Sequence, residues 1–266
     1  MNTAAKSTSS RKPRQPAVVT TDSESKHREI EREKEVASLR DLFLRMQTAH
    51  QPPDIESPRG RILDTALTLF AEKGFHGVGV REIAIAANVN QAMVHYYFNT
   101  KEQLYHRVIA TQMVNVAQFA LSQLDLSIPP SELILSFPRR ITRMLVENPK
   151  WSRLILREVA EGGKHLAATV IELGELGPQG LSVHLGRLYK KGSQFGDLID
   201  LQPSMAIPLL IGFSYSATFI EPFFRIISQT EGESEKFNEL RIELMEHLWR
   251  CGMTTPLPRG KKHASK

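Results

Sequence analysis

A short run of hydrogen-bonding, aromatic and basic side chains between residues 91 and 101 is the part of the chain best suited to bind another molecule. Gln91 carries an amide that can pair with the edge of adenine, while Ala92 and Met93 can contact the methyl group of thymine. Lys101 is a cation in the first turn of an expected helix, where free backbone amides also attract an anion. Together these residues are suited to contact the bases and phosphates of DNA.

Two short helices joined by a tight turn would position these side chains. In the first helix, apolar residues recur at three- and four-residue spacing and form one stripe: Val80, Ile83, Ala84 and Ala87. Asn88 can adopt the left-handed backbone that ends a helix, and Asn90 can cap the next one, which runs from about residue 91 to 97. The pattern predicts a helix-turn-helix.

The second short helix is expected to have a polar outer face. Val94 would turn inward with Tyr97 or Phe98, and the outward residues are Gln91, Ala92, Met93, His95 and Tyr96. At least one of Tyr96 and Tyr97 must face outward, because adjacent helical residues lie about 100° apart. Thr100 and Gln103 form a capping box for the following helix, and we interpret Lys101 as a phosphate ligand, the alternative being a solvated surface lysine.

This segment resembles the DNA-binding part of TetR-type (TetR/AcrR) transcriptional regulators over about residues 58 to 110. In that family an Ile-Ala pair, a Gly-Val-Ser turn, a Tyr-Tyr-Phe cluster and a Ser-Lys-Glu follow one another. The counterparts here are Ile83-Ala84, Asn88-Val89-Asn90, His95-Tyr96-Tyr97-Phe98 and Thr100-Lys101-Glu102. Asn88 replaces the usual Gly, and His95 replaces a Tyr at a position that contacts phosphate in the family.

The resemblance implies an all-α fold, with an N-terminal three-helix helix-turn-helix domain followed by a helical ligand-binding and dimerisation domain. It also implies a set of DNA-binding residues: Arg81, Asn90, Gln91, Ala92, Met93, His95, Tyr96, Tyr97, Thr100 and Lys101. The first helix of that domain is expected to begin after the Ser57 cap with Pro58 and to end at Gly74.

Composition and punctuation divide the chain into five parts. A basic tail poor in large apolar residues, expected to be disordered, is followed by an extra amphipathic helix with its linker, the DNA-binding domain, the ligand-binding and dimerisation domain, and a second basic tail. The predicted boundaries are 1–24, 25–56, 57–104, 105–252 and 253–266.

The extra helix, from about residue 25 to 50, is unusual for the family. Charged residues of both signs alternate in its first half, and an apolar stripe follows at Val36, Leu39, Phe43 and Met46. This stripe can pack on its own domain or on a dimer mate, or it can contact DNA or another protein. Pro52-Pro53 would end the helix and act as a hinge.

Composition bounds the partners and the compartment. The formal charge of +5 favours a polyanion partner, although much of it lies in the two tails. A single cysteine, Cys251, and no apolar signal segment after the polar start predict a cytoplasmic protein. The apolar run from 207 to 220 is interrupted by Pro208 and Gly212, so no membrane span is expected.

The rest of the chain reads as helices separated by Pro and Gly. The expected ranges are about 101–125, 131–147, 150–161, 164–191, 204–219 and 234–251, with breaks at Pro138 and near Gly177-Pro178. The family pairs its last two long helices across a dimer, which here implies an interface formed by Leu209, Leu210, Phe213, Ala217, Ile220, Leu244 and Leu248; the alternative is that these residues belong to the intramolecular core. Candidate pocket residues from the middle helices are Phe119, Met144, Trp151, Arg153 and His165.

An enzyme is not expected. The sequence has no phosphate-cradling Gly-rich loop, no metal-ligand spacing and no nucleophile elbow, and its histidines are scattered, so neither a cofactor nor a metal is predicted. We expect a homodimeric transcriptional regulator, a repressor released from a near-palindromic DNA operator by a small-molecule effector. The alternative is a DNA-bound structural or protein-interaction factor that signals through its N-terminal helix.

Overall fold

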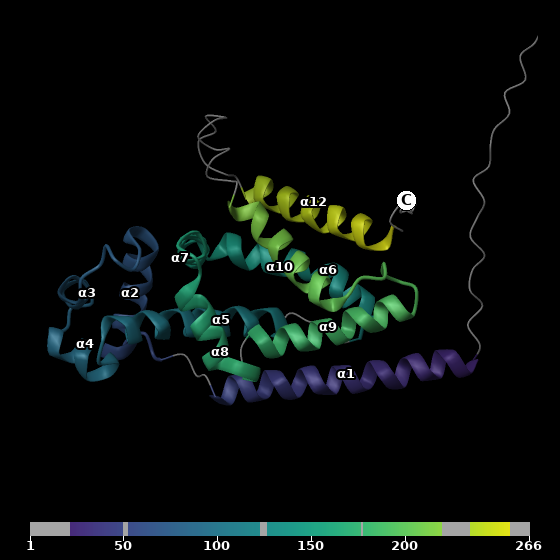
Figure 1. The fold of residues 1–266 in the computed structure, drawn as a ribbon, viewed down its shortest axis with the longest axis horizontal. Helices are drawn as coiled ribbons and strands as arrows, with labels where there is room; N and C mark the ends of the chain where they lie inside the picture. Colours follow the sequence, from purple (N-terminus) through teal and green to yellow (C-terminus); the bar gives the residue numbers. More distant parts are fainter. Residues whose placement is uncertain (1–21, 50–52, 123–126, 177, 220–234, 256–266) are drawn as a thin grey trace, which may run out of the picture.

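The computed structural model describes residues 22–49, 53–122, 127–176, 178–219 and 235–255, and within these ranges all regular structure is helical. The all-α prediction is therefore confirmed for this part of the chain. The helices of the predicted helix-turn-helix domain form one end of the molecule, and the remaining helices form a larger bundle beside them (Figure 1). The predicted tails and the Pro52-Pro53 hinge lie wholly or partly outside the described residues.

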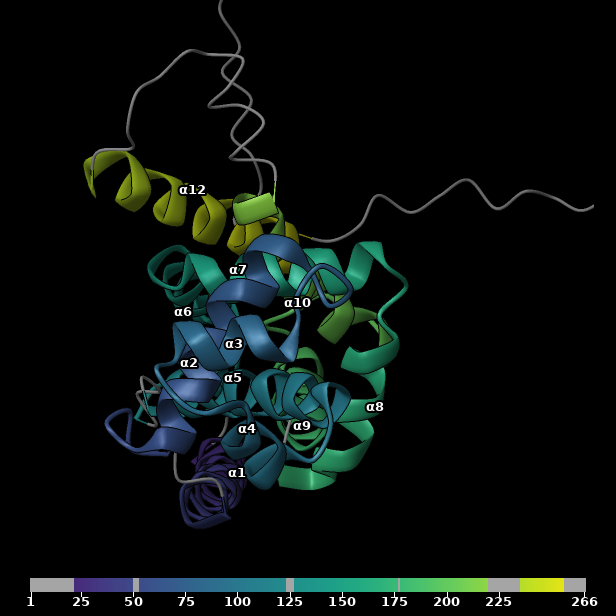
Figure 2. The same ribbon diagram turned by 90° about the vertical axis from the view of Figure 1, so that its left-hand side faces the viewer.

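Three short helices form the end of the molecule that faces the viewer in Figure 2. They are α2 (Pro58–Lys73), α3 (Val80–Ala86) and α4 (Gln91–Phe98). The α2 helix begins as predicted, because the Ser57 side chain accepts a hydrogen bond from the Gly60 amide at 3.0 Å and Pro58 follows. It ends at Gly74, whose φ of 74° is in the region that glycine tolerates best.

The next helix, α5 (Lys101–Ser122), belongs to both parts of the molecule. Its first half completes the core of the DNA-binding domain, where Tyr105 meets Phe70 edge to face with ring centroids 4.8 Å apart. Its second half is buried in the larger bundle through Met113, Val114 and Ala117. The two parts therefore share one continuous helix.

The larger bundle has α6 (Pro130–Glu147) at its centre, where α6 packs against α9, α10 and α12. The bounds of the other helices are α7 (Pro149–Ala160), α8 (Lys164–Leu173), a 3₁₀ turn η1 (Gly174–Leu176), α9 (Pro178–Gln194), α10 (Pro203–Phe219) and α12 (Glu235–Thr254). The break expected near Gly177-Pro178 is present, because α8 gives way to η1 before α9 begins.

Pro138 does not break its helix, contrary to the sequence prediction. A proline has no amide to donate to the carbonyl four residues earlier, so Ile134 loses its helical partner. In the structure, the indole nitrogen of Trp249 on α12 donates to the Ile134 oxygen at 3.3 Å. The helix therefore continues, and the bond that it lacks is replaced by a contact with α12.

The extra N-terminal helix is α1 (Asp22–Ala49), which lies along α5 and α9 of the larger bundle (Figure 1). Leu39, Leu42 and Met46 are buried. Lys191 of α9 lies between two carboxylates of α1, at 2.8 Å from Glu31 and 3.0 Å from Glu35. Of the alternatives for this helix, the structure shows packing on its own chain.

We predict that Trp249→Phe lowers the free energy of unfolding by about 1–2 kcal/mol, because it leaves the buried Ile134 carbonyl without a donor. Phenylalanine can retain the ring contact with Phe213, whose centroid lies 5.6 Å from that of Trp249. In a Pro138→Ala background the new amide can donate to Ile134, so the same substitution should cost less. Equal costs in the two backgrounds, measured by chemical denaturation, would contradict this pairing.

Hydrogen bonds from Lys191 and then from Lys34 lower the pKa of Glu31 from 4.5 to about 2. The folded-state pKa lies below the unfolded one, so this contact stabilises the packing of α1 above about pH 4.5 and is lost as the pH falls toward 2. We predict that Lys191→Met moves the Glu31 pKa upward, toward 4.5, in a carboxylate titration followed by NMR. The neighbouring exposed Lys190→Met is the control and should leave this titration unchanged.

Candidate nucleic-acid interface

The turn between α3 and α4 has the geometry that the sequence predicts. Asn88 has a φ of 52°, and the following Val89 amide donates back to the Ala84 carbonyl at 3.0 Å. The side chain of Asn90 then accepts from the Ala92 amide at 2.9 Å and caps α4. Asn thus supplies the left-handed conformation that Gly provides elsewhere in the family.

The α4 helix has one buried and one exposed face. Val94 and Phe98 are buried, so Phe98 rather than Tyr97 is the second inward residue. Tyr96 is 80% exposed, Tyr97 is half-buried, and their rings meet edge to face at 5.1 Å. The predicted outward residues Gln91, Ala92 and His95 are also exposed, whereas Met93 is half-buried.

His95 is tied to the end of its own helix. Its Nδ1 lies 3.0 Å from the carbonyl oxygen of Asn99, which can only accept, so Nδ1 carries the proton in this contact. Asn99 has a positive φ of 52° and forms the sharp corner between α4 and α5. The exposed imidazole keeps its Nε2 for a partner outside the chain.

Lys101 has an internal role that the sequence did not indicate. Its ammonium donates to the Val78 carbonyl at 2.9 Å and lies 4.4 Å from the centroid of the Phe75 ring. The amide of Gln103 donates to the Thr100 hydroxyl at 3.1 Å, so the predicted cap of α5 is present. Lys101 thus holds the loop before α3 against α5, and one of its three N–H groups is engaged in doing so.

Arg81 is exposed at the start of α3, and its neighbour Glu82 forms an ion pair with Lys73 of α2. The hydrogen bond in this pair lowers the pKa of Glu82 and raises that of Lys73. The pair joins α2 to α3 at the surface and leaves the Arg81 position free for an outside partner.

An apolar cavity of about 380 Å³ lies inside the larger bundle, between helices α5 to α10. Of the five predicted pocket residues, only Trp151 lines it. Met144 is buried in the core, Arg153 is exposed, Phe119 is packed against the core, and His165 lies beside His106. The cavity is lined by residues that include Met113, Val116, Phe137, Ile141, Trp151, Ile155, Leu181, Ser182, Leu185, Ile211 and Tyr215. Periodicity cannot identify such residues, because every helix here has an apolar face.

The few polar groups of this cavity include the hydroxyls of Ser182 and Tyr215. Burial raises the pKa of Tyr215 to about 12. Tyr215 is therefore a neutral phenol at physiological pH. A small molecule bound in this cavity would contact mainly apolar side chains and a few uncharged hydrogen-bonding groups.

The α7 helix connects this cavity to the DNA-binding domain. Trp151 and Ile155 line the cavity, while Arg157 of the same helix donates to the carbonyls of Ala71 at 3.1 Å and Glu72 at 2.7 Å. Those two carbonyls lie in the last turn of α2, where helical carbonyls lack an internal partner. A movement of α7 would therefore displace the C-terminal end of α2.

The predicted dimer residues divide into two groups. Leu209, Leu244 and Leu248 are between 51% and 53% exposed. Leu210 belongs instead to the core of its own chain, and Phe213 is half-buried against Trp249. The side chain of Ala217 and the whole of Ile220 lie outside the described residues.

None of the helices in the described ranges is both long and apolar enough to span a membrane.

Two short helices joined by an asparagine turn, with an exposed polar face on the second, define a DNA-binding protein of the helix-turn-helix class. The model of the tetR family of bacterial regulatory proteins matches residues 62–108, the segment that contains this motif. The chain therefore contains a TetR-type DNA-binding domain and is similar to transcriptional regulators of that family.

Two curated relatives are transcriptional regulators. YttP of Bacillus subtilis, a probable HTH-type regulator, is 26% identical over 189 residues, which cover 64% of this chain and 90% of YttP. IcaR of Staphylococcus epidermidis, a negative regulator of the biofilm operon icaADBC, is 33% identical over 51 residues. That second match covers only 19% of this chain and 28% of IcaR.

A solved structure shows the same fold over a longer range. The crystal structure of AibR in complex with isovaleryl coenzyme A and operator DNA has a TM-score of 0.55 and 19% identity, and the match covers 72% of this chain and 97% of AibR. At this identity the likeness concerns the fold.

Lys101→Met separates the internal role of this lysine from its predicted phosphate contact. We expect a loss of about 1 kcal/mol in unfolding free energy, because the bond to Val78 disappears while the aliphatic stem remains. We also expect the slope of log binding constant against log salt to fall in magnitude by about one for each DNA-bound subunit. The exposed Lys190 of α9 provides the control substitution, Lys190→Met. An unchanged salt slope together with lower stability would show that Lys101 has a structural role and does not contact phosphate.

Proposed function

We propose that this regulator is a homodimeric repressor of a near-palindromic operator, released when a small molecule enters the apolar cavity. The observation that carries the proposal is the position of that cavity, whose walls include the two helices that hold the DNA-binding domain. These are α5, which continues from the motif, and α7, which is bonded to α2.

On the DNA side, the proposed base contacts are Gln91, Ala92 and Met93, at the N-terminal end of α4, which would enter the major groove. Phosphate contacts are assigned to the residues around them. This group consists of Arg81, Asn90, His95, Tyr96, Tyr97, Thr100 and Lys101. Exposure of Gln91, Ala92, His95 and Tyr96 supports this assignment.

The proposed dimer interface is supported by exposed apolar side chains on α10 and α12. Leu240, Leu244 and Leu248 recur every four residues on α12 and are 62%, 53% and 51% exposed. On α10, Met205 and Leu209 are 56% and 52% exposed at the same spacing. A two-fold partner would cover such a surface, and two recognition helices one DNA turn apart would match a near-palindrome.

The proposed effector is a small molecule with an apolar body and a group that hydrogen-bonds to Tyr215 or Ser182. Lining residues are almost all apolar, and those two hydroxyls provide polar contacts inside the cavity. Among the related proteins, AibR has been solved with both isovaleryl coenzyme A and operator DNA, and IcaR is a negative regulator. These relatives favour effector-controlled repression, and the cavity supplies a place for the effector.

The proposed coupling is a shift between two states. An effector that prefers the DNA-incompetent spacing of the recognition helices lowers operator affinity by its differential affinity for the two states and by no more. In this chain the difference would be transmitted through α5 and through Arg157 to the end of α2.

The test begins by selecting bound fragments from random DNA and then screening small molecules that release the selected operator. We predict an inverted repeat, and we predict that Arg157→Met reduces the effector-induced loss of operator affinity by about tenfold or more. Arg153→Met, four residues earlier on the same helix and exposed, should keep the wild-type response.

Three outcomes would contradict the proposal. Selection of a single half-site by a monomer would contradict the dimeric repressor. Effector binding that survives substitution of Trp151 by a bulkier or charged residue in the cavity would place the effector elsewhere. An Arg157→Met response equal to that of Arg153→Met would remove α7 from the coupling.

A further inference from the structure

Three potential metal ligands meet between α5 and α8, away from the apolar cavity. Glu102 and His106 are four residues apart on α5, and His165 is the second residue of α8. Their ligand atoms all lie within 4.8 Å of one another. Sequence reasoning could not identify this cluster, because 59 positions separate the two histidines.

The separation of the imidazole nitrogens suits a shared metal ion. His106 Nε2 lies 3.0 Å from His165 Nδ1. Two nitrogen ligands that each lie about 2.0–2.1 Å from a tetrahedral Zn²⁺ are about 3.3–3.4 Å apart, so the two rings need to separate by only a few tenths of an ångström for the ion to replace the hydrogen bond between them. The nearest Glu102 carboxylate oxygen is 3.9 Å from the same His165 nitrogen, and its side chain is 58% exposed, so it can close the remaining distance by rotation.

The His165 ring is held in place by its surroundings. It packs against Phe75 and Tyr105, with ring centroids 4.9 Å and 5.1 Å away. Its backbone amide donates to the buried carboxylate of Glu158 at 2.7 Å. Such support lowers the cost of ordering a ligand when the metal binds.

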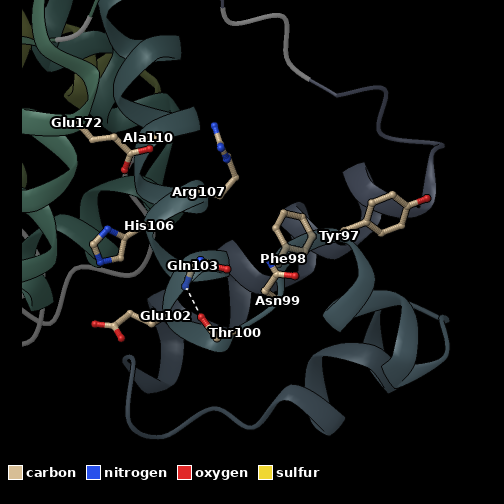
Figure 3. A pocket seen from close by; sticks show the side chains of 10 residues that line it. All are labelled: Tyr97, Phe98, Asn99, Thr100, Glu102, Gln103, His106, Arg107, Ala110 and Glu172. Carbon is tan, nitrogen blue, oxygen red and sulfur yellow. Dashed lines mark hydrogen bonds between the residues drawn. The ribbon is translucent and has the colours of Figure 1, made fainter.

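A polar recess beside these residues leaves room for further ligands. Glu102 and His106 project from the same side of α5, and Glu172 of α8 also lines the recess (Figure 3). Its volume is about 570 Å³. Water can therefore reach a metal held by the three residues.

We propose that Glu102, His106 and His165 bind one divalent transition-metal ion of the Zn²⁺ class. Two imidazoles and one carboxylate are a borderline-soft ligand set that favours Zn²⁺ over Mg²⁺, which prefers oxygen ligands and near-octahedral geometry. Bound metal would fasten α8 to the first turns of α5, directly after the recognition helix. Its effect on operator binding rests on the proposed function, whereas metal binding itself does not.

The test is calorimetric titration of the full chain, without a polyhistidine tag, with Zn²⁺ and separately with Mg²⁺. We expect one Zn²⁺ per chain and no comparable Mg²⁺ binding. His106→Gln and His165→Gln should abolish Zn²⁺ binding, and Glu102→Gln should weaken it by about tenfold or more. Unchanged helical circular dichroism in each variant shows that the fold is intact, and the exposed Glu102 is the substitution least able to disturb it.

Two matched controls isolate the site. His76→Gln alters a histidine that packs on the same Phe75 ring, 5.1 Å away, but lies outside the cluster. Cys251→Ser removes the thiol that lies 3.7 Å from His247 Nε2 on α12, another pair able to bind zinc. Both controls should bind Zn²⁺ as the wild type does.

The proposed site would be wrong if the chain did not bind Zn²⁺, if His106→Gln bound it with wild-type affinity, or if Cys251→Ser lost binding. The affinity for operator DNA provides a separate measurement. Zn²⁺ should change this affinity in the wild type and leave it unchanged in His106→Gln. If the chain binds Zn²⁺ but selects no operator at all, the proposed function fails while the metal site stands.

Discussion

The arrangement of the helices depends on one buried carboxylate, that of Glu158 near the end of α7. It is only 2% exposed, and burying a carboxylate is costly unless its oxygens are satisfied. Its oxygens accept from the Tyr105 hydroxyl at 2.9 Å and from the amides of His165 and Leu166 at 2.7 and 3.1 Å. The residue before α8 is Gly163, which has no side chain to cap those amides, so Glu158 of the neighbouring helix does so instead. Burial, and then the bond to Glu158, raises the pKa of Tyr105. One charged group thereby fixes α5, α7 and α8 relative to one another.

This junction joins the DNA-binding domain to the walls of the cavity through continuous helices, without a flexible connection. Tyr105 lies in the half of α5 that packs with Phe70 of the DNA-binding domain, while Met113 of the same helix lines the cavity. On α7, Ile155 lines the cavity, and Glu158 holds α5 three residues later. In the proposed mechanism, a ligand that pushed these walls apart would act on rigid, hydrogen-bonded helices, so a small displacement would be carried to α2 and α4 rather than absorbed.

Features that depend on neighbours in sequence were predictable, and those that depend on distant partners were not. The Asn88 turn and the Asn90 and Thr100 caps follow from contacts within a few residues, and all are present. The continuation of α6 through Pro138 depends on Trp249, more than a hundred positions away. The internal hydrogen bond of Lys101 depends on the Val78 carbonyl. The lining of the cavity also depends on distant partners. Trp151 was predicted correctly, but the sequence pattern could not show that Met144 and Arg153 lie outside the lining. Pairing of His106 with His165 also needs the tertiary fold.

The recognition helix is attached to the core by few side chains. Among its residues only Val94 and Phe98 are buried, and its ends are set by Asn90 and by the corner at Asn99. Gln91 and Ala92, the exposed members of its proposed base contacts, could therefore be exchanged without repacking the interior. A duplicated gene could acquire a new target site through those two codons while the cavity and the rest of the fold stayed unchanged. The exposed residues of α4 and the lining of the cavity thus lie in separate parts of the fold, so each can change in sequence without altering the other.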